Sequence, residues 1–306
     1  MSETVCAVVP TYNSADSLPN AIESIRNQNW PGLEIIVVDD GSTDDTAAVL
    51  RKLGAGDLRV IRQKNGGPGA ARNRALEITA AEWVAFLDAD DIWLPHKLEM
   101  QMDCLRSERS HGFCYADSLR RTISGKESVR RAPGPARGAF RSLLLGPRFD
   151  LSTVVVRRDC FAQVGLFDPE LRTGEDWDLW LRLSALCHGC YVPKPLSVYR
   201  VPSDPDKYPL PMYERCQVRI LGRLFSNQNI ARVWPKLAQC RGQVYAWHYA
   251  TLAKAFLHGR RLPGFLRLAV ASVSSHPMGI YFLARRWSSL EGWPTFDLLE
   301  DDGARS

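Results

Sequence analysis

The stretch WVAFL-DADD, residues 83–91, places an acidic cluster directly behind a short apolar run. The run is typical of a buried strand, so the cluster is expected at the carboxyl end of that strand. In open α/β sheets this edge is where ligands bind. Two carboxylates separated by one residue in an extended chain point the same way, because side chains alternate between the two faces. Asp88 and Asp90 are therefore predicted to share one hard cation, which a substrate diphosphate would complete.

Three further blocks of turn-forming and polar residues stand upstream, each where a predicted strand gives way to a helix. They are Pro10–Asn13 after the strand 5–9, Asp39–Ser42 after the strand 35–38, and Asn65–Asn73 after the strand 58–62. A D-x-D sequence alone arises by chance in a chain of this length. Four such blocks in order, on one alternating pattern, indicate a shared site.

The pattern of the first hundred residues predicts the fold class. Helices are expected at 14–28, 44–53, 69–79 and 95–106, between and after the four strands. Repeated strand–helix units predict an α/β fold with a Rossmann-like, mostly parallel sheet flanked by helices. Further on we expect a strand at 111–117, a loop at 118–141, a strand at 152–156, a helix from about 158, a helix at 175–185, and short extended pieces at 191–192 and 196–199.

The last third of the chain has a different character. Residues 201–211 are rich in Pro and Asp and are expected to form a linker. Helices are predicted beyond the linker, at about 213–224, 230–259, 261–274 and 279–287. We therefore expect two domains, an α/β domain at 1–210 and a helical, basic extension at 211–306.

The net charge of +5 hides a strongly basic region. Between residues 215 and 290 there are twelve Lys and Arg residues and no acidic residue, and aromatic side chains alternate with them. Basic amphipathic helices with aromatic residues bind anionic membrane surfaces. A phosphorylated substrate would also suit this charge, and a solvated face of a helical subdomain is the simplest alternative. No recognisable nucleic-acid motif is present, so we expect no nucleic-acid partner.

Targeting signals and cysteine spacing favour a cytoplasmic protein, peripheral at the inner face of the membrane if the basic region docks there. The amino terminus has no basic flank or apolar run of signal length, and no stretch of about 20 apolar residues is present. Among eight Cys, only Cys187 and Cys190 have C-x-x-C spacing, and no second pair completes a zinc site. Ordinary reduced thiols are expected.

The glycine block does not fit a known phosphate-binding fingerprint. In Gly67–Arg72, Arg72 stands where the dinucleotide motif needs its third Gly, and no P-loop sequence occurs. Glycines that open a helix can still let the backbone approach a phosphate or a base. A purely structural helix start is the alternative.

Taken together, the blocks resemble the inverting family 2 glycosyltransferases with a GT-A fold. The resemblance rests on VVPTYN, IIVVDDGSTDDT, NGGPGAARNRAL and FLDADDIWLPHKLE, and later on STVVVRRDCFAQVGLFDPEL, GEDWDLWLRL and PLSVYR, so that it covers about residues 4–202. It implies a nucleotide-sugar donor, Mg²⁺ or Mn²⁺, and a glycan or lipid-linked acceptor in cell-surface polysaccharide synthesis.

The resemblance also implies which residues bind the nucleotide. Pro10 and Tyr12 stand where the family packs the base. Asp40, with Asp39 beside it, stands where a carboxylate hydrogen-bonds the base. Arg72 stands where a side chain reaches the nucleotide.

The resemblance assigns the metal and the base as well. Asp90 is the expected direct metal ligand, with Asp88 as its partner on the ribose or phosphate side, and Asp176 is the expected general base. An inverting transfer needs one carboxylate to deprotonate the acceptor hydroxyl, and the leaving diphosphate needs a divalent cation. Many GT-A enzymes place a further metal-binding His after this Tyr-Arg, where the present chain has Pro202.

Alternatives remain for these residues and for the whole chain. Glu175 and Asp176 would also suit an acidic helix start, and Trp177 and Trp180 are expected in the core rather than against a sugar. Two other functions stay open: a nucleotide-sugar-binding regulator without catalysis, and a nucleotidyltransferase. The latter would carry a glycine-rich loop with Lys or Arg after the first strand, where this chain has Pro-Thr-Tyr-Asn.

Overall fold

The structure is a computed structural model that describes residues 3–54, 56–134, 136–202, 209–259 and 261–284. It divides into two compact units. The first comprises the described residues up to Phe140 together with Pro147–Pro205, and the second comprises Arg141–Gly146 and the described residues beyond 206. The domain boundary predicted at residue 210 stays a prediction.

The first four long strands form the parallel half of the sheet in the first unit. They are β1 (Val5–Thr11), β2 (Leu33–Asp39), β3 (Leu58–Arg62) and β4 (Trp83–Phe86), in the order β3-β2-β1-β4. β1 and β4 are buried along their whole length, as expected for unbroken apolar runs in a parallel sheet. Thr11 pairs with Asp39, so the carboxyl ends of β1 and β2 lie side by side.

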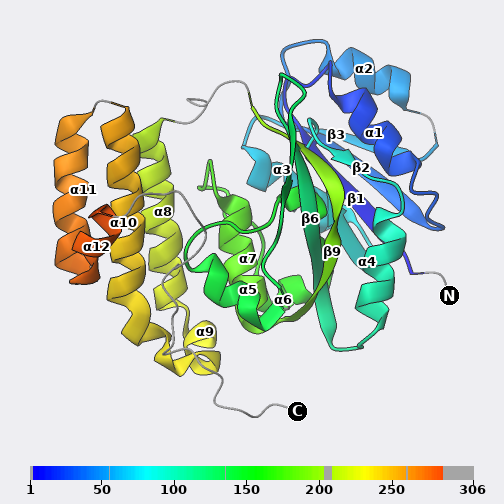
Figure 1. The fold of residues 1–306 in the computed structure, drawn as a ribbon. Helices are drawn as coiled ribbons and strands as arrows, with labels where there is room; N and C mark the ends of the chain where they lie inside the picture. The colour runs from blue at the N-terminus through cyan, green and yellow to red at the C-terminus, as the bar shows by residue number, and fades with distance from the viewer. Residues whose placement is uncertain (1–2, 55, 135, 203–208, 260, 285–306) are drawn as a thin grey trace. The chain divides into compact units, whose positions relative to one another are not determined.

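Helices cover both faces of this half, as predicted (Figure 1). The four helices that follow these strands are α1 (Leu18–Arg26), α2 (Thr46–Leu53), α3 (Pro68–Ile78) and α4 (Lys97–Arg106). α1 and α4 pack with Ala7, Val9 and Val37 on one face. α3 packs against β1 and β2 on the other face.

The second half of the sheet is mixed, which differs from the mostly parallel prediction. Beyond β4 the order is β8 (Val155–Arg157), β6 (His111–Arg121), β9 (His188–Arg200) and β5 (Ile92–Trp93), and β7 (Glu127–Arg130) pairs with β6. β8 runs antiparallel to both β4 and β6, whereas β6 and β9 are parallel. Antiparallel neighbours need no helical crossover, and the chain leading to β8 contains a hairpin and short helices instead.

The prediction of a loop over 118–141 is wrong. β6 continues to Arg121, β7 follows, and α5 spans Ala136–Leu143. An ion pair between Arg121 and Glu127, which lie opposite each other in the β6–β7 ladder, holds the hairpin next to its turn. Most of β7 faces solvent and its residues are mainly polar or charged, so the sequence shows no apolar alternation that would predict a strand.

β9 is one strand of 13 residues rather than two short pieces. The prediction separated the pieces because Pro193 and Pro195 interrupt the pattern. The register against β6 shifts at this place, between Ala116 and Asp117. Proline is tolerated at such an irregularity, because a missing N–H costs no regular ladder bond there.

Aromatic side chains fill the core beneath α7 (Glu175–Leu186). The ring of Trp180 lies 6.1 Å from that of Phe86 and 5.8 Å from that of Phe149, centroid to centroid. Trp177 and Trp180 are both fully buried. Their predicted place in the core is confirmed, and α7 is thereby fixed against β4.

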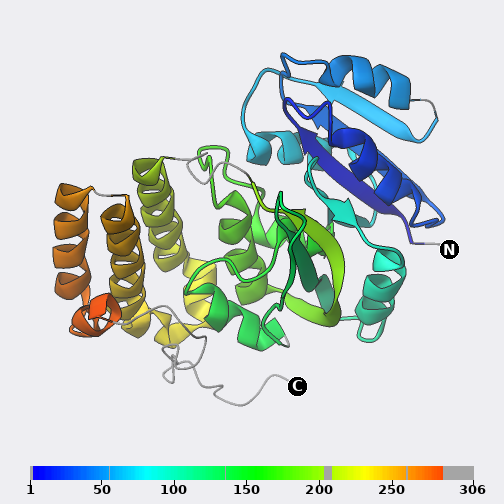
Figure 2. The same cartoon turned by 45° about the horizontal axis from the view of Figure 1, so that its top comes forward.

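The second unit is helical, as the sequence predicts. Its elements are α8 (Leu210–Ser226), α9 (Gln228–Val233), the 3₁₀ helix η2 (Pro235–Cys240), α10 (Arg241–His258), α11 (Leu262–Ser275) and α12 (Met278–Ala284). α8, α10 and α11 run side by side (Figure 2). The single helix predicted over 230–259 is wrong because Pro235 cannot donate the helical hydrogen bond. Most of the predicted linker, at 203–208, and the end of the last predicted helix lie outside the described residues.

Segment 141–146 belongs to this helical unit although the chain of the first unit continues after it. The imidazole Nε2 of His248 lies 2.9 Å from the carbonyl oxygen of Leu144. The indole of Trp247 donates to the carbonyl of Leu145 over 3.2 Å. None of the described helices is long and apolar enough to cross a bilayer.

Candidate active site

The predicted site residues gather at one edge of the sheet. β1, β2 and β4 are adjacent and parallel, and Tyr12, Asp40 and Asp88 follow directly on their carboxyl ends or one residue later. Because parallel strands end on the same side, the three loops meet there. Three of the four blocks noted in the sequence therefore lie together at the carboxyl edge of the parallel strands.

Reciprocal hydrogen bonds join the first two loops. The amide oxygen of Asn13 accepts from the N–H of Thr43 over 2.8 Å, and the N–H of Asn13 donates to Ser42 Oγ over 3.0 Å. Asp39 accepts from the N–H of Ser42 over 2.8 Å. Asn13 has φ 50°, a left-handed conformation that Asn adopts more readily than most residues. The loop after β1 is therefore held by the loop after β2.

Asp40 anchors the glycine turn that opens α3. One carboxylate oxygen accepts from the N–H of Gly66 over 2.9 Å and from the Gln63 amide over 2.8 Å, and the other accepts from the N–H of Gly67 over 2.7 Å. Gly67 has φ 91°, and a Cβ there would lie 2.7 Å from a guanidinium nitrogen of Arg172. The backbone conformation favours glycine, whereas the end of the Arg172 side chain can move aside for a Cβ.

The four residues predicted to bind the base differ in their access to solvent. Pro10 lies within β1 opposite Val38 and is buried, as are Asp39 and Asp40. Tyr12 is 48% exposed. Of these four, Tyr12 thus presents its side chain most freely, and the predicted contacts of all four with a base stay predictions.

Arg72 is the centre of the site. Its guanidinium donates to Asp88 Oδ1 and to Glu175 Oε1, both over 2.7 Å, and its side chain is only 3% exposed. It also lies over the ring of Phe167. Burial alone would lower the pKa of Arg72, but the two carboxylates outweigh it and raise that pKa. The guanidinium thus joins α3, the D-x-D loop and the start of α7.

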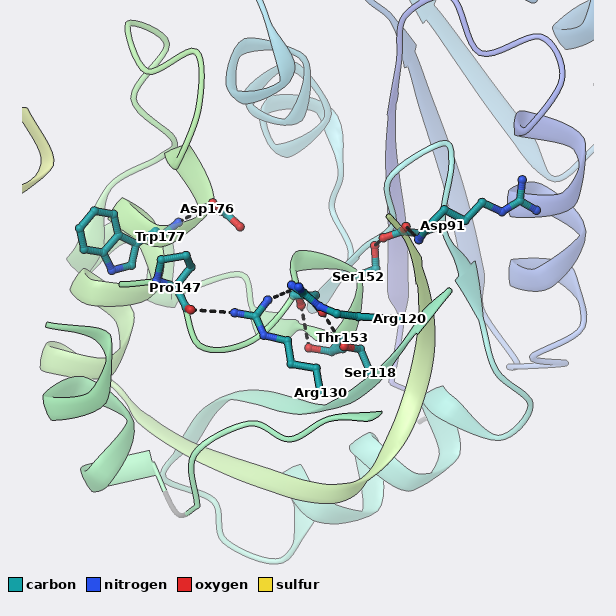
Figure 3. A network of polar contacts seen from close by, with 11 residues as sticks. Asp91, Ser118, Arg120, Arg130, Pro147, Ser152, Thr153, Asp176 and Trp177 are labelled. Atoms are coloured by element: carbon teal, nitrogen blue, oxygen red, sulfur yellow. Dashed lines mark hydrogen bonds and ion pairs between the residues drawn. The ribbon is translucent and has the colours of Figure 1, made fainter. Parts of the chain in front are cut away.

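Asp91 supports the D-x-D loop from behind (Figure 3). It is buried and accepts from Ser152 Oγ over 2.6 Å and from the backbone N–H of Arg200 over 3.0 Å. Burial, with the charges of Asp88 and Asp90, raises the pKa of Asp91 well above its usual value. The loop is therefore tied to the 3₁₀ helix η1 (Leu151–Thr153) and to the end of β9.

The D-x-D carboxylates suit a hard divalent cation. The Asp88 side chain is one-third exposed and Asp90 is exposed, so both face solvent at the rim. After burial, the charges of Asp88 and Asp90 are the next causes of the raised pKa of Asp91, and a bound cation would offset these charges. Carboxylate oxygens are the ligands that Mg²⁺ and Mn²⁺ prefer.

Asp176 lies at the first turn of α7, after Gly174 in a left-handed conformation. It is half-buried, and one of its oxygens accepts from the N–H of Trp177 over 2.7 Å. Burial, and then the charge of Glu175, raise the pKa of Asp176 to about 7 against the opposing effect of Arg72. A carboxyl group with a pKa near neutrality is suited to take a proton from a hydroxyl group.

A second polar network, around Asp150, orders the polypeptide between β7 and η1. Ser118, Arg120 and Arg130 all contact the Asp150 carboxylate, and Arg130 also donates to the carbonyl of Pro147 over 2.7 Å. Figure 3 shows both arginines directed toward the η1 turn that carries Ser152. Asp150 thus links Ser118 and Arg120 of β6 with Arg130 of β7.

Several residues that build the site were not assigned roles from sequence. Glu175 pairs with Arg72, and Asp91 and Ser152 hold the D-x-D loop. Asn73 exchanges two hydrogen bonds with the backbone of Phe167, of 2.9 and 3.0 Å. A signal for Asp91 exists in the sequence, because the apolar Ile92-Trp93 directly after it indicates that the chain returns to the core there.

Comparison with protein families identifies the family that the first half of the chain matches. Residues 6–146 match the model of glycosyl transferase family 2. The putative teichuronic acid biosynthesis glycosyltransferase TuaG of Bacillus subtilis is 32% identical over 182 residues, which are 58% of this chain and 71% of TuaG. The succinoglycan biosynthesis protein ExoU of Rhizobium meliloti is 32% identical over 60% of this chain and 57% of its own.

Longer relatives and solved structures extend this similarity. An uncharacterized glycosyltransferase of Rickettsia bellii is 29% identical over 76% of this chain. The matched region is only 34% of that longer relative. S. aureus TarS 1-349, solved with UDP-GlcNAc, matches with a TM-score of 0.66 and 19% identity over 92% of this chain and 83% of its own. The mannosyltransferase PcManGT of Pyrobaculum calidifontis, solved with GDP-Man and Mn²⁺, matches with a TM-score of 0.58 and 18% identity over 92% and 84%. These structures share the GT-A fold.

The raised pKa of Asp176 gives a testable prediction. In metal-free protein the Asp176 carboxyl group should titrate near pH 7. NMR of the labelled carboxyl carbon measures this titration. Replacing Glu175→Gln should lower that pKa, because it removes a neighbouring negative charge. Since the folded pKa lies above the unfolded one, the contribution of Asp176 to stability is greatest at low pH and declines as pH rises toward 7. The control Glu77→Gln, on the exposed side of α3, should leave the titration unchanged.

Proposed function

The chain belongs to glycosyl transferase family 2, and from this we propose that it transfers a sugar, with inversion, from a nucleotide-sugar donor to a hydroxyl group of a glycan or lipid-linked acceptor. The observation that carries the proposal is the arrangement around Arg72. One guanidinium pairs with Asp88 of the solvent-facing D-x-D and with Glu175. Glu175 directly precedes the half-buried Asp176, whose pKa is raised to about 7.

The proposed reaction is a single displacement at the anomeric carbon. Asp176 accepts the proton of the acceptor hydroxyl while its oxygen forms the new bond to that carbon. The bond to the diphosphate oxygen breaks on the opposite face, which inverts the configuration. Only one catalytic carboxylate is needed on the acceptor side, since no covalent sugar intermediate forms.

Asp90 and Asp88 would hold the divalent cation, Mg²⁺ or Mn²⁺. When bound, such a cation neutralises the charge that develops on the leaving diphosphate. Pro202 offers no ligand where related enzymes have a His, so the two carboxylates carry more of the binding. The PcManGT complex with Mn²⁺ supports use of a divalent cation in this fold.

The donor would lie along the carboxyl edge of β1, β2 and β4. The exposed ring of Tyr12 is suited to stack on a base. Asp39 and Asp40 also fix the surrounding loops, so they would position the pocket even where they contact no base. The TarS and PcManGT complexes with UDP-GlcNAc and GDP-Man support a nucleotide-sugar donor.

The acceptor is proposed to belong to cell-surface polysaccharide synthesis. TuaG and ExoU are named for teichuronic acid and succinoglycan biosynthesis, which supports this class. The two rival functions differ in product. A glycosyltransferase releases nucleoside diphosphate, a nucleotidyltransferase releases pyrophosphate, and a binding regulator releases neither. Incubation with UDP-GlcNAc or GDP-Man and Mn²⁺, followed by anion-exchange analysis, separates the three.

Replacing Asp176→Asn tests the general base. Asn keeps the size and most of the hydrogen bonding but cannot take a proton. We expect turnover to fall by about two to four orders of magnitude while donor affinity stays within a few-fold. Transfer rates and donor binding are measured on the same preparation. A near-normal transfer rate would show that another residue removes the proton.

Replacing Asp90→Ala tests the metal site. We expect loss of turnover and of the Mn²⁺-dependent part of nucleotide binding, because a carboxylate ligand is removed. Calorimetric titration of nucleoside diphosphate with and without Mn²⁺ gives the readout. Asp103→Ala, an exposed carboxylate on α4, is the matched control and should behave as wild type. Unchanged Mn²⁺-dependent turnover in the Asp90 variant would contradict the assignment.

We further propose that the helical unit docks on an anionic membrane surface, which would place the protein at the inner face of a membrane. α11 carries an exposed apolar stripe, formed by Leu262, Leu266, Val270 and Val273. Leu268 and Ser272 on the opposite side are buried against neighbouring helices. Between 215 and 290 there are twelve basic residues and no acidic residue, so the segment carries a net positive charge that is complementary to anionic lipid. Arg267, on α11 itself, is paired with Glu214.

Liposome binding tests the docking surface. The full chain should sediment with anionic vesicles at low salt, less at high salt, and weakly with neutral vesicles. The double variant Leu266→Ser/Val270→Ser should weaken binding at least about tenfold, because two apolar side chains no longer enter the interface. Ile123→Ser, an exposed apolar residue of the sheet unit, is the control. Failure to bind anionic vesicles at low salt, or self-association through the stripe, would overturn the membrane assignment.

A further inference from the structure

Three cysteine side chains from distant parts of the sequence meet between α4 and the sheet. The sulfur atoms of Cys104, Cys114 and Cys190 all lie within 4.8 Å of one another. Cys114 on β6 and Cys190 on β9 are cross-strand partners in the parallel ladder, and Cys104 faces them from α4. Cys114 is fully buried, Cys190 is 7% exposed, and Cys104 is half-buried.

The helix face that carries Cys104 brings further polar groups into the same layer. Lys97, Gln101 and Cys104 are spaced by four and three residues, so they lie on one side of α4. Lys97 and Gln101 are both fully buried. The ammonium nitrogen of Lys97 and the amide oxygen of Gln101 have no hydrogen-bond partner. The Lys97 ammonium lies over the ring of Trp93, 4.4 Å from its centroid, so the Gln101 oxygen is the acceptor that lacks a partner in this layer.

We propose that Cys104, Cys114 and Cys190 bind a soft, thiophilic metal ion, Zn²⁺ or Cu⁺. Thiolate sulfur selects these ions over Mg²⁺ and Mn²⁺. Zinc–sulfur bonds are about 2.3 Å long, which places sulfurs bound to one ion roughly 4 Å apart. The observed separations lie within reach of that spacing after small side-chain movements. The site is separate from the D-x-D, because Cys114 and Cys190 lie near the amino-terminal ends of β6 and β9.

Binding forms three sulfur–metal bonds and changes no oxidation state. Each thiol that ligates as thiolate releases its proton to solvent. For Zn²⁺ a fourth position is left for a water molecule or a backbone oxygen, whereas Cu⁺ is satisfied by three sulfurs. The bound ion would join α4 to β6 and β9. It would thus brace the helix that follows the D-x-D loop.

The C-x-x-C pair noted in the sequence, Cys187 and Cys190, does not form this site as a pair, because only Cys190 belongs to the group of three. Cys187 is adjacent instead to Cys160, outside the group of three. The chain therefore provides a matched control for any test of thiol chemistry. Cys187 has the same half-buried character as Cys104 but lacks the two further sulfurs.

Metal titration of the full-length chain tests the site. The reduced, metal-free protein is titrated anaerobically with Co²⁺ and Cd²⁺, followed by thiolate-to-metal charge-transfer absorption, and then challenged with Zn²⁺. A separate titration uses Cu⁺ delivered from a chromophoric chelator. We expect one equivalent to bind, Zn²⁺ or Cu⁺ to raise the melting temperature, and Mg²⁺ to give neither effect. Comparison of the dissociation constants for Zn²⁺ and Cu⁺ shows which of the two ions the site prefers.

Variants assign the ligands. Cys104→Ser should weaken binding at least about a hundredfold, more than the loss of an outer-shell contact, and Cys187→Ser should match wild type. Because Cys104 is half-buried, its Ser variant is expected to fold, which circular dichroism checks. Cys190→Ser provides a second test of the same ligand set. Equal binding by Cys104→Ser and wild type, or no charge-transfer band in wild type, would show that these are core thiols only.

Discussion

One buried guanidinium holds the site together. Arg72 occupies a position from which two nitrogens of its planar fork reach two carboxylates on separate parts of the chain, Asp88 and Glu175. A lysine could not serve in the same way, because its single ammonium lacks the fixed geometry of the fork. Removing charges from water is costly, so such a pair persists only with near-ideal hydrogen bonds. The 2.7 Å contacts meet that condition.

The same region keeps features that a purely stable protein would avoid. Asp91 is buried among carboxylates, Asp176 has a pKa raised to about 7, and the Nε atom of Arg72 has no hydrogen-bond partner. Each of these costs free energy of folding. Proteins commonly depart from local rules where they bind or react, and offset the cost through packing elsewhere. Here the aromatic core around Trp180 and Phe86 supports the start of α7.

The sequence predicted the parallel half of the fold well because each of its strands is a short apolar run followed by turn residues. Asp40, Gly67 and Asp88 mark such transitions, and all lie at the expected edge. The antiparallel half was harder. β7 is mostly solvent-exposed and β9 contains prolines at a register shift, so neither shows a clear period. The partners of Arg72 were not predictable because Glu175 lies 103 residues away and contact between them depends on tertiary structure.

Segment 141–146 has a consequence for the order in which the chain becomes structured. Its carbonyl groups at Leu144 and Leu145 accept from side chains 104 and 102 residues later. During synthesis this segment leaves the ribosome long before α10, its partner helix. The helical unit therefore cannot be completed until almost the whole chain has emerged. An exchange of the carboxyl-terminal helices between relatives would need to carry these six residues with it.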